Sequence, residues 1–237
     1  MGRAFEVRKQ SMAKTGAVKS AINGRAAKEI YLAAKQGGSV DPNANLALRA
    51  AIDKAKTKQV PNDTIQRALK RAQGNDHENY VSNRYEGYGP SGSMIIVDSL
   101  TSNVNRAISE IRDVFNKNGG KLATAGAVSY AFHDCSVFGF DEMNVEQTFE
   151  YLFEAEVEIN DVVEEDEMTI VYAPFTAFND VKKALDKKIK NYKIAETTML
   201  ANEEVILDGE NKIKFEKLCD KLNELEDVQN LYHNVKE

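Results

Sequence analysis

Several features are scarce or missing in this chain of 237 residues, and each absence excludes a class of protein. There are only two cysteines, Cys135 and Cys219, and they stand far apart. This spacing fits neither a disulfide framework nor a zinc site, and it indicates a reduced, cytosolic protein with two buried, inert thiols. No apolar run approaches the ~18 residues that a membrane-spanning helix needs. The charged start is followed by no apolar stretch, so we expect no signal peptide.

Lysine and arginine are missing from one long segment. Between Leu122 and Val181 there is no Lys or Arg, against 14 Asp and Glu, so this stretch would repel a nucleic-acid backbone. Three interpretations stay open: a solvated surface that suppresses self-association, a docking face for a basic protein, or attraction to a basic part of the same chain. The acidic residues lack the spacing of a calcium loop. We expect no metal ion and no cofactor.

The charge is divided between the two ends of the chain. Residues 1–80 hold 15 basic and 7 acidic residues, a net charge of +8. Residues 81–237 hold 16 basic and 30 acidic residues, a net charge of −14. A basic module on an acidic body is typical of a protein that binds a polyanion at one end. The alternative is that the cations only keep a small helical domain soluble.

The first 80 residues predict a basic arm and three short helices. Residues 1–17 are polar and show little periodicity. Apolar residues at intervals of three and four then predict a helix that ends at Gly37-Gly38. Asp41-Pro42 predicts the start of a second helix. Pro61 predicts the start of a third, which Gly74 closes.

The rest of the chain predicts two α/β domains of ferredoxin-like type. Residues 94–97, 103–117 and 127–132 predict strand, helix and strand, and a strand, a helix (211–225) and a strand recur in the tail. Residues 134–202 predict a βαββαβ order. The first helix of this order is expected at 145–154, with Phe149, Leu152 and Phe153 as the apolar residues that pack into the core. We therefore expect an α+β protein: a three-helix bundle in residues 1–80, an α/β domain formed by residues 83–133 with 203–237, and an acidic α/β domain, residues 134–202, inserted into it. A single continuous sheet is the alternative.

Two short strings match catalytic or nucleotide-binding motifs only in part. Gly87–Gly92 matches G-x-G-x-x-G, but it precedes a strand, and Pro90 removes an amide that a phosphate would need. Gly89–Ser93 lacks the last glycine of a nucleophile elbow. We expect a rigid turn between domains here and no enzyme active site.

Leu100–Arg106 lies at the end of a predicted strand and opens a helix. Free amides at a helix start can hold an anion, and Arg106 adds a positive charge. The alternative is that the polar side chains at 101–103 only cap the helix. The candidate contacts with a partner or ligand are Tyr85, Tyr88, Asn103, Asn105 and Arg106.

Several strings of the sequence resemble the YebC/PmpR family. They are Arg84-Tyr85-Glu86-Gly87-Tyr88-Gly89-Pro90-Ser91-Gly92, Leu100-Thr101, Asn103 to Arg106, and Gly119-Gly120. Lys28-Glu29-Ile30-Tyr31 and Ile52-Asp53-Lys54-Ala55-Lys56 agree with the family, and the opening Met1 to Lys9 resembles its YeeN-type branch. The similarity spans essentially the whole chain.

This resemblance implies a helical N-terminal domain and two α/β domains in a cytoplasmic, non-enzymatic protein. The family is generally described as DNA-binding transcriptional regulators. Some relatives, including a mitochondrial translational activator, act in translation, and relief of ribosome stalling is attributed to the family. Residues 21–27 depart from the pattern, since another basic residue and aromatics are expected there. Gly24 in mid-helix costs roughly 1 kcal/mol relative to alanine, which puts binding through the first helix in doubt.

We therefore expect a regulator of gene expression that binds nucleic acid mainly through phosphates. No known reading helix is evident, so base specificity should be modest. The target is DNA or, as the alternative, ribosomal RNA on the ribosome, with a basic protein as possible partner of the acidic domain and no membrane contact. The candidate phosphate contacts are the cations of the arm and the bundle: Arg8, Lys9, Lys14, Lys19, Arg25, Lys28, Lys54, Lys58, Arg67, Lys70 and Arg71.

Overall fold

The computed structural model describes residues 16–74 and 79–236, in which three helices are followed by a mixture of strands and helices. The helices are α2 (Gly16–Gln36), α3 (Leu46–Thr57), α4 (Asn62–Gln73), α5 (Val104–Lys117), α6 (Val145–Glu154), α7 (Phe178–Leu185) and α8 (Gly209–Glu224), with 3₁₀ turns η1 (Pro90–Gly92), η2 (Ser129–Ala131) and η3 (Phe175–Ala177). The strands are β1 (Val81–Tyr88), β2 (Met94–Thr101), β3 (Lys121–Leu122), β4 (Phe132–Phe140), β5 (Asp161–Glu165), β6 (Met168–Pro174), β7 (Ile194–Ala201), β8 (Val205–Ile206), β9 (Val228–His233) and β10 (Val235–Lys236). None of the described helices is both long and apolar enough to cross a bilayer.

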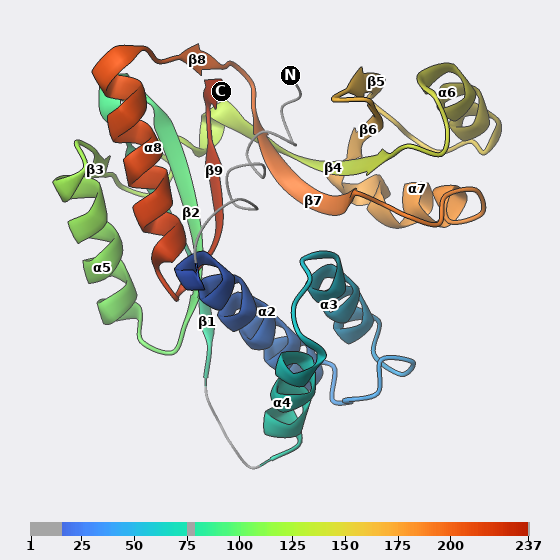
Figure 1. The fold of residues 1–237 in the computed structure, drawn as a ribbon, viewed down its shortest axis with the longest axis horizontal. Coiled ribbons are helices and arrows are strands. Elements are labelled where there is room, and N and C mark those ends of the chain that lie inside the picture. Colours follow the sequence, from blue (N-terminus) through green and yellow to red (C-terminus); the bar gives the residue numbers. More distant parts are fainter. Residues whose placement is uncertain (1–15, 75–78, 237) are drawn as a thin grey trace. The chain divides into compact units, whose positions relative to one another are not determined.

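The three N-terminal helices form a bundle in which α3 and α4 each pack against α2 (Figure 1). Its core consists of small and aliphatic side chains together with the buried ring of Tyr31, and Ile30 and Leu48 are fully buried in it. α4 follows Pro61 and ends before Gly74, as predicted. The predicted three-helix bundle is therefore confirmed.

The second helix of the bundle starts later than the sequence indicated. Asp41 accepts a hydrogen bond from the Asn43 N–H in a turn (2.9 Å), and the helix begins only after Asn45. The Asn45 Oδ1 accepts a hydrogen bond from the Leu48 N–H (3.0 Å), and its Nδ2 donates to the Ala33 carbonyl (2.9 Å). The predicted start at Asp41-Pro42 is wrong, because a buried asparagine caps α3 and ties it to α2 at the same time.

The first four-stranded sheet has the order β3-β1-β2-β9, with antiparallel neighbours. α5 and α8 contact each other and cover the sheet (Figure 1). The two strands at its centre, β1 and β2, form a hairpin. β1 was not predicted, because its residues are mostly polar and show no apolar alternation in the sequence.

The glycine-rich motif lies within this sheet, so the prediction of a turn between domains is wrong. Its turn joins β1 to β2, with positive φ at Ser91 (56°) and Gly92 (76°). The buried Glu86 carboxylate accepts hydrogen bonds from the N–H groups of Gly126, Val128 and Ser129 at 2.7–2.9 Å. Glu86, the residue just before the motif on β1, therefore anchors the loop that follows β3.

The second sheet has the order β5-β6-β4-β7 and carries α6 and α7. This is the ferredoxin-like βαββαβ arrangement that the sequence predicted. Because β9 of the tail pairs with β2, the segment that forms this sheet is inserted into the first α/β domain, and a single continuous sheet is excluded. The finer domain bounds given above remain a prediction.

Two details of this part of the chain differ from expectation. The predicted strand at 127–132 is wrong, since residues Ser129–Ala131 form η2 and the strand begins at Phe132. α6 has the predicted bounds, but Leu152 and Thr148 are buried whereas Phe149 and Phe153 are 52% and 74% exposed. The rings that we expected in the core therefore face solvent.

Candidate nucleic-acid interface

The predicted phosphate contacts fall into several groups in the structure. Arg8, Lys9 and Lys14 lie outside the described residues. Lys19 is exposed near the start of α2. The remaining candidates divide into cations on α4, cations on α3, and two side chains of α2 that face the protein interior.

The α4 group consists of Arg67, Lys70 and Arg71, which share one exposed face of the helix. The Arg71 guanidinium lies over the Tyr31 ring, 5.4 Å from its centroid. Lys35, which is not among the predicted phosphate contacts, lies 5.9 Å from the centroid of the same ring and donates to the Gly74 carbonyl (2.9 Å). The one feature of the sequence that could have indicated Lys35 is its position in the last turn of the predicted first helix.

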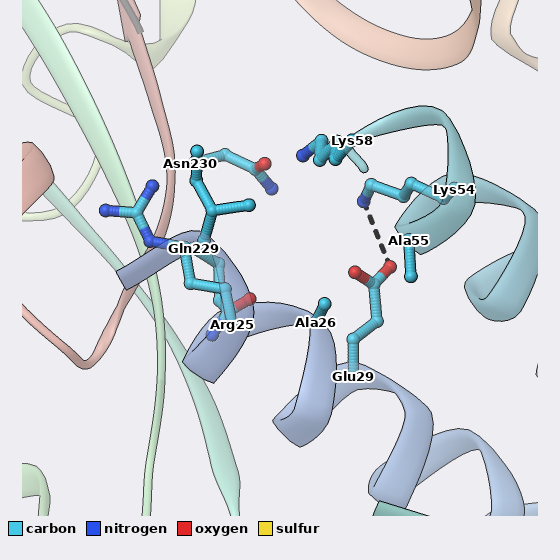
Figure 2. Close-up of a pocket in the computed structure, with 9 residues that line it drawn as sticks. Arg25, Ala26, Glu29, Lys54, Ala55, Lys58, Gln229 and Asn230 are labelled. Atoms are coloured by element: carbon cyan, nitrogen blue, oxygen red, sulfur yellow. Dashed lines mark hydrogen bonds and ion pairs between the residues drawn. The ribbon is translucent and has the colours of Figure 1, made fainter. Parts of the chain in front are cut away.

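The α3 group consists of Lys54 and Lys58. The Lys54 Nζ forms an ion pair with the Glu29 carboxylate of α2 at 3.0 Å (Figure 2). Both lysines line a cavity of about 30 Å³ together with residues of α2 and β9. A cavity of this size holds about one water molecule, so it is no pocket for a nucleotide.

The α3 and α4 groups lie on different flanks of α2. Glu29 of α2 contacts α3 through Lys54, whereas Tyr31 of α2 contacts Arg71 of α4. Residues two positions apart point about 200° away from each other around a helix. Lys54 and Arg71 therefore contact α2 on different flanks, which the sequence could not decide.

Arg25 and Lys28 bind other parts of the protein. Lys28 is only 7% exposed, and its Nζ lies 2.7 Å from the Asp227 Oδ1. The Arg25 Nη2 donates to the Asn223 carbonyl at the end of α8 (2.5 Å), and burial lowers the pKa of Arg25 to about 10. The prediction that Lys28 contacts phosphate is therefore wrong for this conformation, because its ammonium is buried in an ion pair.

Asp227 is the centre of a buried polar cluster. Its Oδ2 accepts hydrogen bonds from the Arg106 Nη2 (2.7 Å) and the Thr101 Oγ1 (2.9 Å), in addition to the contact with Lys28. Burial raises the pKa of Asp227, but the hydrogen bonds from Lys28, Arg106 and Thr101 lower it by more, so that the pKa lies below its usual value. The carboxylate is ionised at neutral pH and joins α2, β2 and α5.

This cluster accounts for the Leu100–Arg106 motif without an external ligand. The Asn103 Oδ1 caps α5 by accepting a hydrogen bond from the Arg106 N–H (3.1 Å), as the capping interpretation proposed. The Tyr88 hydroxyl donates to the Ala127 carbonyl (2.9 Å). Tyr85 is half-buried on β1, and Asn105 is exposed on the first turn of α5. A ligand or partner role for these five residues remains a prediction.

The chain is similar to proteins of one family over nearly its full length. Residues 3–75 match the family described as TACO1/YebC protein N-terminal domain, and residues 80–235 match the one described as TACO1/YebC second and third domain. A Mycoplasma capricolum protein named "Probable transcriptional regulatory protein" is 58% identical over 238 residues, 99% of each chain. The Mesoplasma florum protein named "Probable transcriptional regulatory protein Mfl546" is 56% identical, again over 99% of each chain.

A solved structure has the same fold. The crystal structure of the conserved hypothetical protein Aq1575 from Aquifex aeolicus superposes with a TM-score of 0.79 at 33% sequence identity. The match covers 94% of this chain and 93% of that one. The name of that protein states no function.

Proposed function

Because the chain belongs to the TACO1/YebC family, we propose that it is a non-enzymatic, cytoplasmic regulator of gene expression that binds nucleic acid through its N-terminal helices. The names of the two relatives support a role in gene regulation. The charge division supports a polyanion as ligand, since residues 1–80 carry +8 and the rest carries −14. DNA is the first candidate target.

The observation that carries the proposal is the exposed cationic face of α4. Arg67, Lys70 and Arg71 are exposed on one face of the helix, where they can reach phosphate oxygens. Lys58 and Lys19 are exposed on the neighbouring helices. We exclude Lys28 from this set, and we assign Arg25 to the contact between α2 and α8.

One observation favours ribosomal RNA as a second candidate. The α3 and α4 cations lie on different flanks of α2, so a straight duplex would not contact both groups in a single groove. A folded RNA offers phosphates on more than one side.

The test is the charge reversal Arg67→Glu, Lys70→Glu and Arg71→Glu in the full chain. If the wild type neutralises about six phosphates, log affinity for duplex DNA should fall with log salt at a slope of roughly −5. Loss of three contacts should weaken binding strongly and reduce the slope to roughly −3. Fluorescence anisotropy across a salt series measures both quantities.

The matched control is Lys187→Glu, Lys188→Glu and Lys190→Glu, which makes the same change in net charge on exposed residues of the inserted segment. This control should keep the wild-type affinity and slope. Equal effects of the two triple variants, or no effect of the α4 variant, would refute the assignment of the site.

A second measurement separates the two targets. Co-sedimentation with ribosomes in low and high salt is compared with binding to promoter DNA in the presence of competitor DNA. The target that the wild type prefers, and that the α4 variant loses, is the physiological one. Crosslinking in cells followed by sequencing of the bound DNA and RNA then identifies the sites.

A further inference from the structure

α6 carries two exposed phenylalanine rings side by side. Phe149 is 52% and Phe153 is 74% exposed, and the rings stack with centroids 6.4 Å apart and planes 13° apart. Residues four apart share one face of a helix. Single exposed apolar residues are common on protein surfaces and need no explanation. A cluster of exposed aromatic rings forms a contiguous apolar patch, and such patches mark interaction sites.

The helix that presents these rings is held firmly. A capping box closes its start: the Asn144 Oδ1 accepts from the Gln147 N–H (2.9 Å), and the Gln147 Oε1 accepts from the Asn144 N–H (3.3 Å). Leu152 is fully buried on its inner side. The rings are therefore pre-positioned, and binding of a partner loses little entropy in ordering them.

The two rings point away from the basic side of the inserted segment. The Tyr151 hydroxyl donates to the Ala184 carbonyl of α7 (2.8 Å), and the Lys188 Nζ lies 5.8 Å from the Tyr151 ring centroid. Tyr151 therefore marks the flank of α6 that faces α7 and its lysines. Phe149 and Phe153 are each two positions from Tyr151, about 200° around the helix, so they lie on the opposite flank.

The surroundings of the rings on that flank are acidic. Glu146 and Glu150 are exposed and lie on the same side of the helix as the two rings at 3.6 residues per turn. Residues 122–181, which include α6 and the neighbouring β5, contain no Lys or Arg. An apolar anchor with a rim of one charge sign selects a partner of the opposite sign.

We propose that the outer flank of α6 is a docking surface for a basic protein, one that offers an apolar pocket surrounded by Lys and Arg. Phe149 and Phe153 fill the pocket, as aromatic anchors at i and i+4 do in helix-in-groove recognition. Glu146 and Glu150 pair with the basic rim. A nucleic acid is disfavoured by its charge, and a second α6 would bring like charges together. The proposal uses no residue of the N-terminal bundle and so does not depend on the nucleic-acid site.

The first test is site-specific photocrosslinking in cells. A photoreactive phenylalanine analogue replaces Phe153 in the full chain and, as the control, Phe175, which is 53% exposed in the same compact unit. Mass spectrometry should identify a basic protein, with an isoelectric point above about 9, at position 153 and not at 175. Crosslinks to nucleic acid, to a second copy or to an acidic protein, the same products at both positions, or no product at 153 would overturn the proposal.

The second test measures affinity for the purified crosslinked protein. Phe149→Ser with Phe153→Ser should weaken binding at least tenfold, as expected for a pair of anchors, and Glu150→Lys should weaken it several-fold and flatten its salt dependence. Phe175→Ser should bind like the wild type, and thermal melting should show all variants folded, because the replaced side chains are exposed. Unchanged affinity of the double variant would refute the docking surface. The α4 triple variant should keep partner binding, which separates failure of this proposal from failure of the nucleic-acid site.

Discussion

Asp227 shows how a single residue joins distant parts of the chain. Its carboxylate is 3% exposed and binds Lys28, 199 residues away, and Arg106, 121 residues away. One anion between two cations is well compensated, but the cluster becomes costly when the anion is removed, because two cations then lack a partner. Asp227 therefore links α2 to β2 and α5.

Asp227→Asn should lower the free energy of unfolding by about 3–5 kcal/mol, since it breaks a buried ion pair from one side. Urea denaturation followed by circular dichroism measures the change. Asp113→Asn is the control: its ion pair with Lys117 is on the surface, with side chains 57% and 72% exposed, and its loss should cost less than about 0.5 kcal/mol. Equal free energies of unfolding for the two variants would show that the buried cluster contributes no more to stability than the surface ion pair.

At the scale of the element, α2 is the helix against which both α3 and α4 pack, and it contains a residue, Gly24, that lowers helix stability. The helix runs through Gly24 without interruption. A Cβ atom added at Gly24 would meet nothing within 4 Å. No close contact therefore requires a glycine at this position. Gly24 lowers the stability of the helix because glycine loses more backbone entropy than alanine when it becomes helical.

Gly24→Ala should raise the free energy of unfolding by about 0.5–1 kcal/mol and leave nucleic-acid affinity intact. Gly87→Ala on β1 is a control with the opposite expected result. The added Cβ would lie 2.6 Å from the Phe115 ring, so this substitution should lower the free energy of unfolding. Denaturant titration of the two variants compares them directly. Destabilisation by Gly24→Ala would mean that the helix needs the glycine for a contact that this conformation does not show.

At the scale of the whole molecule, the buried titratable groups make stability depend on pH. Burial lowers the pKa of His233 to about 4, only partly offset by a hydrogen bond with the backbone of Val235. For Glu86, burial raises the pKa, and the amides of Val128, Gly126 and Ser129 lower it by more, so that its net pKa is below the usual value. The pKa of Asp227 is shifted in the same direction. All three groups bind protons more readily in the unfolded chain.

The free energy of unfolding should therefore fall as the pH falls. The contribution of His233 is complete above its unfolded pKa of about 6.5 and is lost down to its folded pKa near 4. Glu86 and Asp227 add a further loss below about pH 4. Denaturation curves at pH 7.5, 5.5 and 4.5 measure this slope, and His233→Leu should remove its upper part. A flat curve for the wild type between pH 6.5 and 4.5 would contradict the prediction.

The sequence by itself determined what depends on neighbouring residues. Helical periodicity and caps predicted the bundle, and the bounds of α6 followed from local pattern. The order of elements predicted the ferredoxin-like insertion, and composition located the positive charge. Periodicity and caps depend on interactions between residues a few positions apart. The net charge of a segment is obtained by counting its residues.

Only the tertiary structure decided which side chains are exposed and can bind a partner. Lys28 and Lys70 look alike in the sequence, since each is a lysine within a helix of the basic bundle, yet Lys28 is buried against Asp227 and Lys70 is exposed. The same holds for Phe149 and Leu152, which are three residues apart on α6 and have opposite exposure. Burial depends on what packs against a face, and the packing partner lies far away in the sequence, so local pattern cannot supply it.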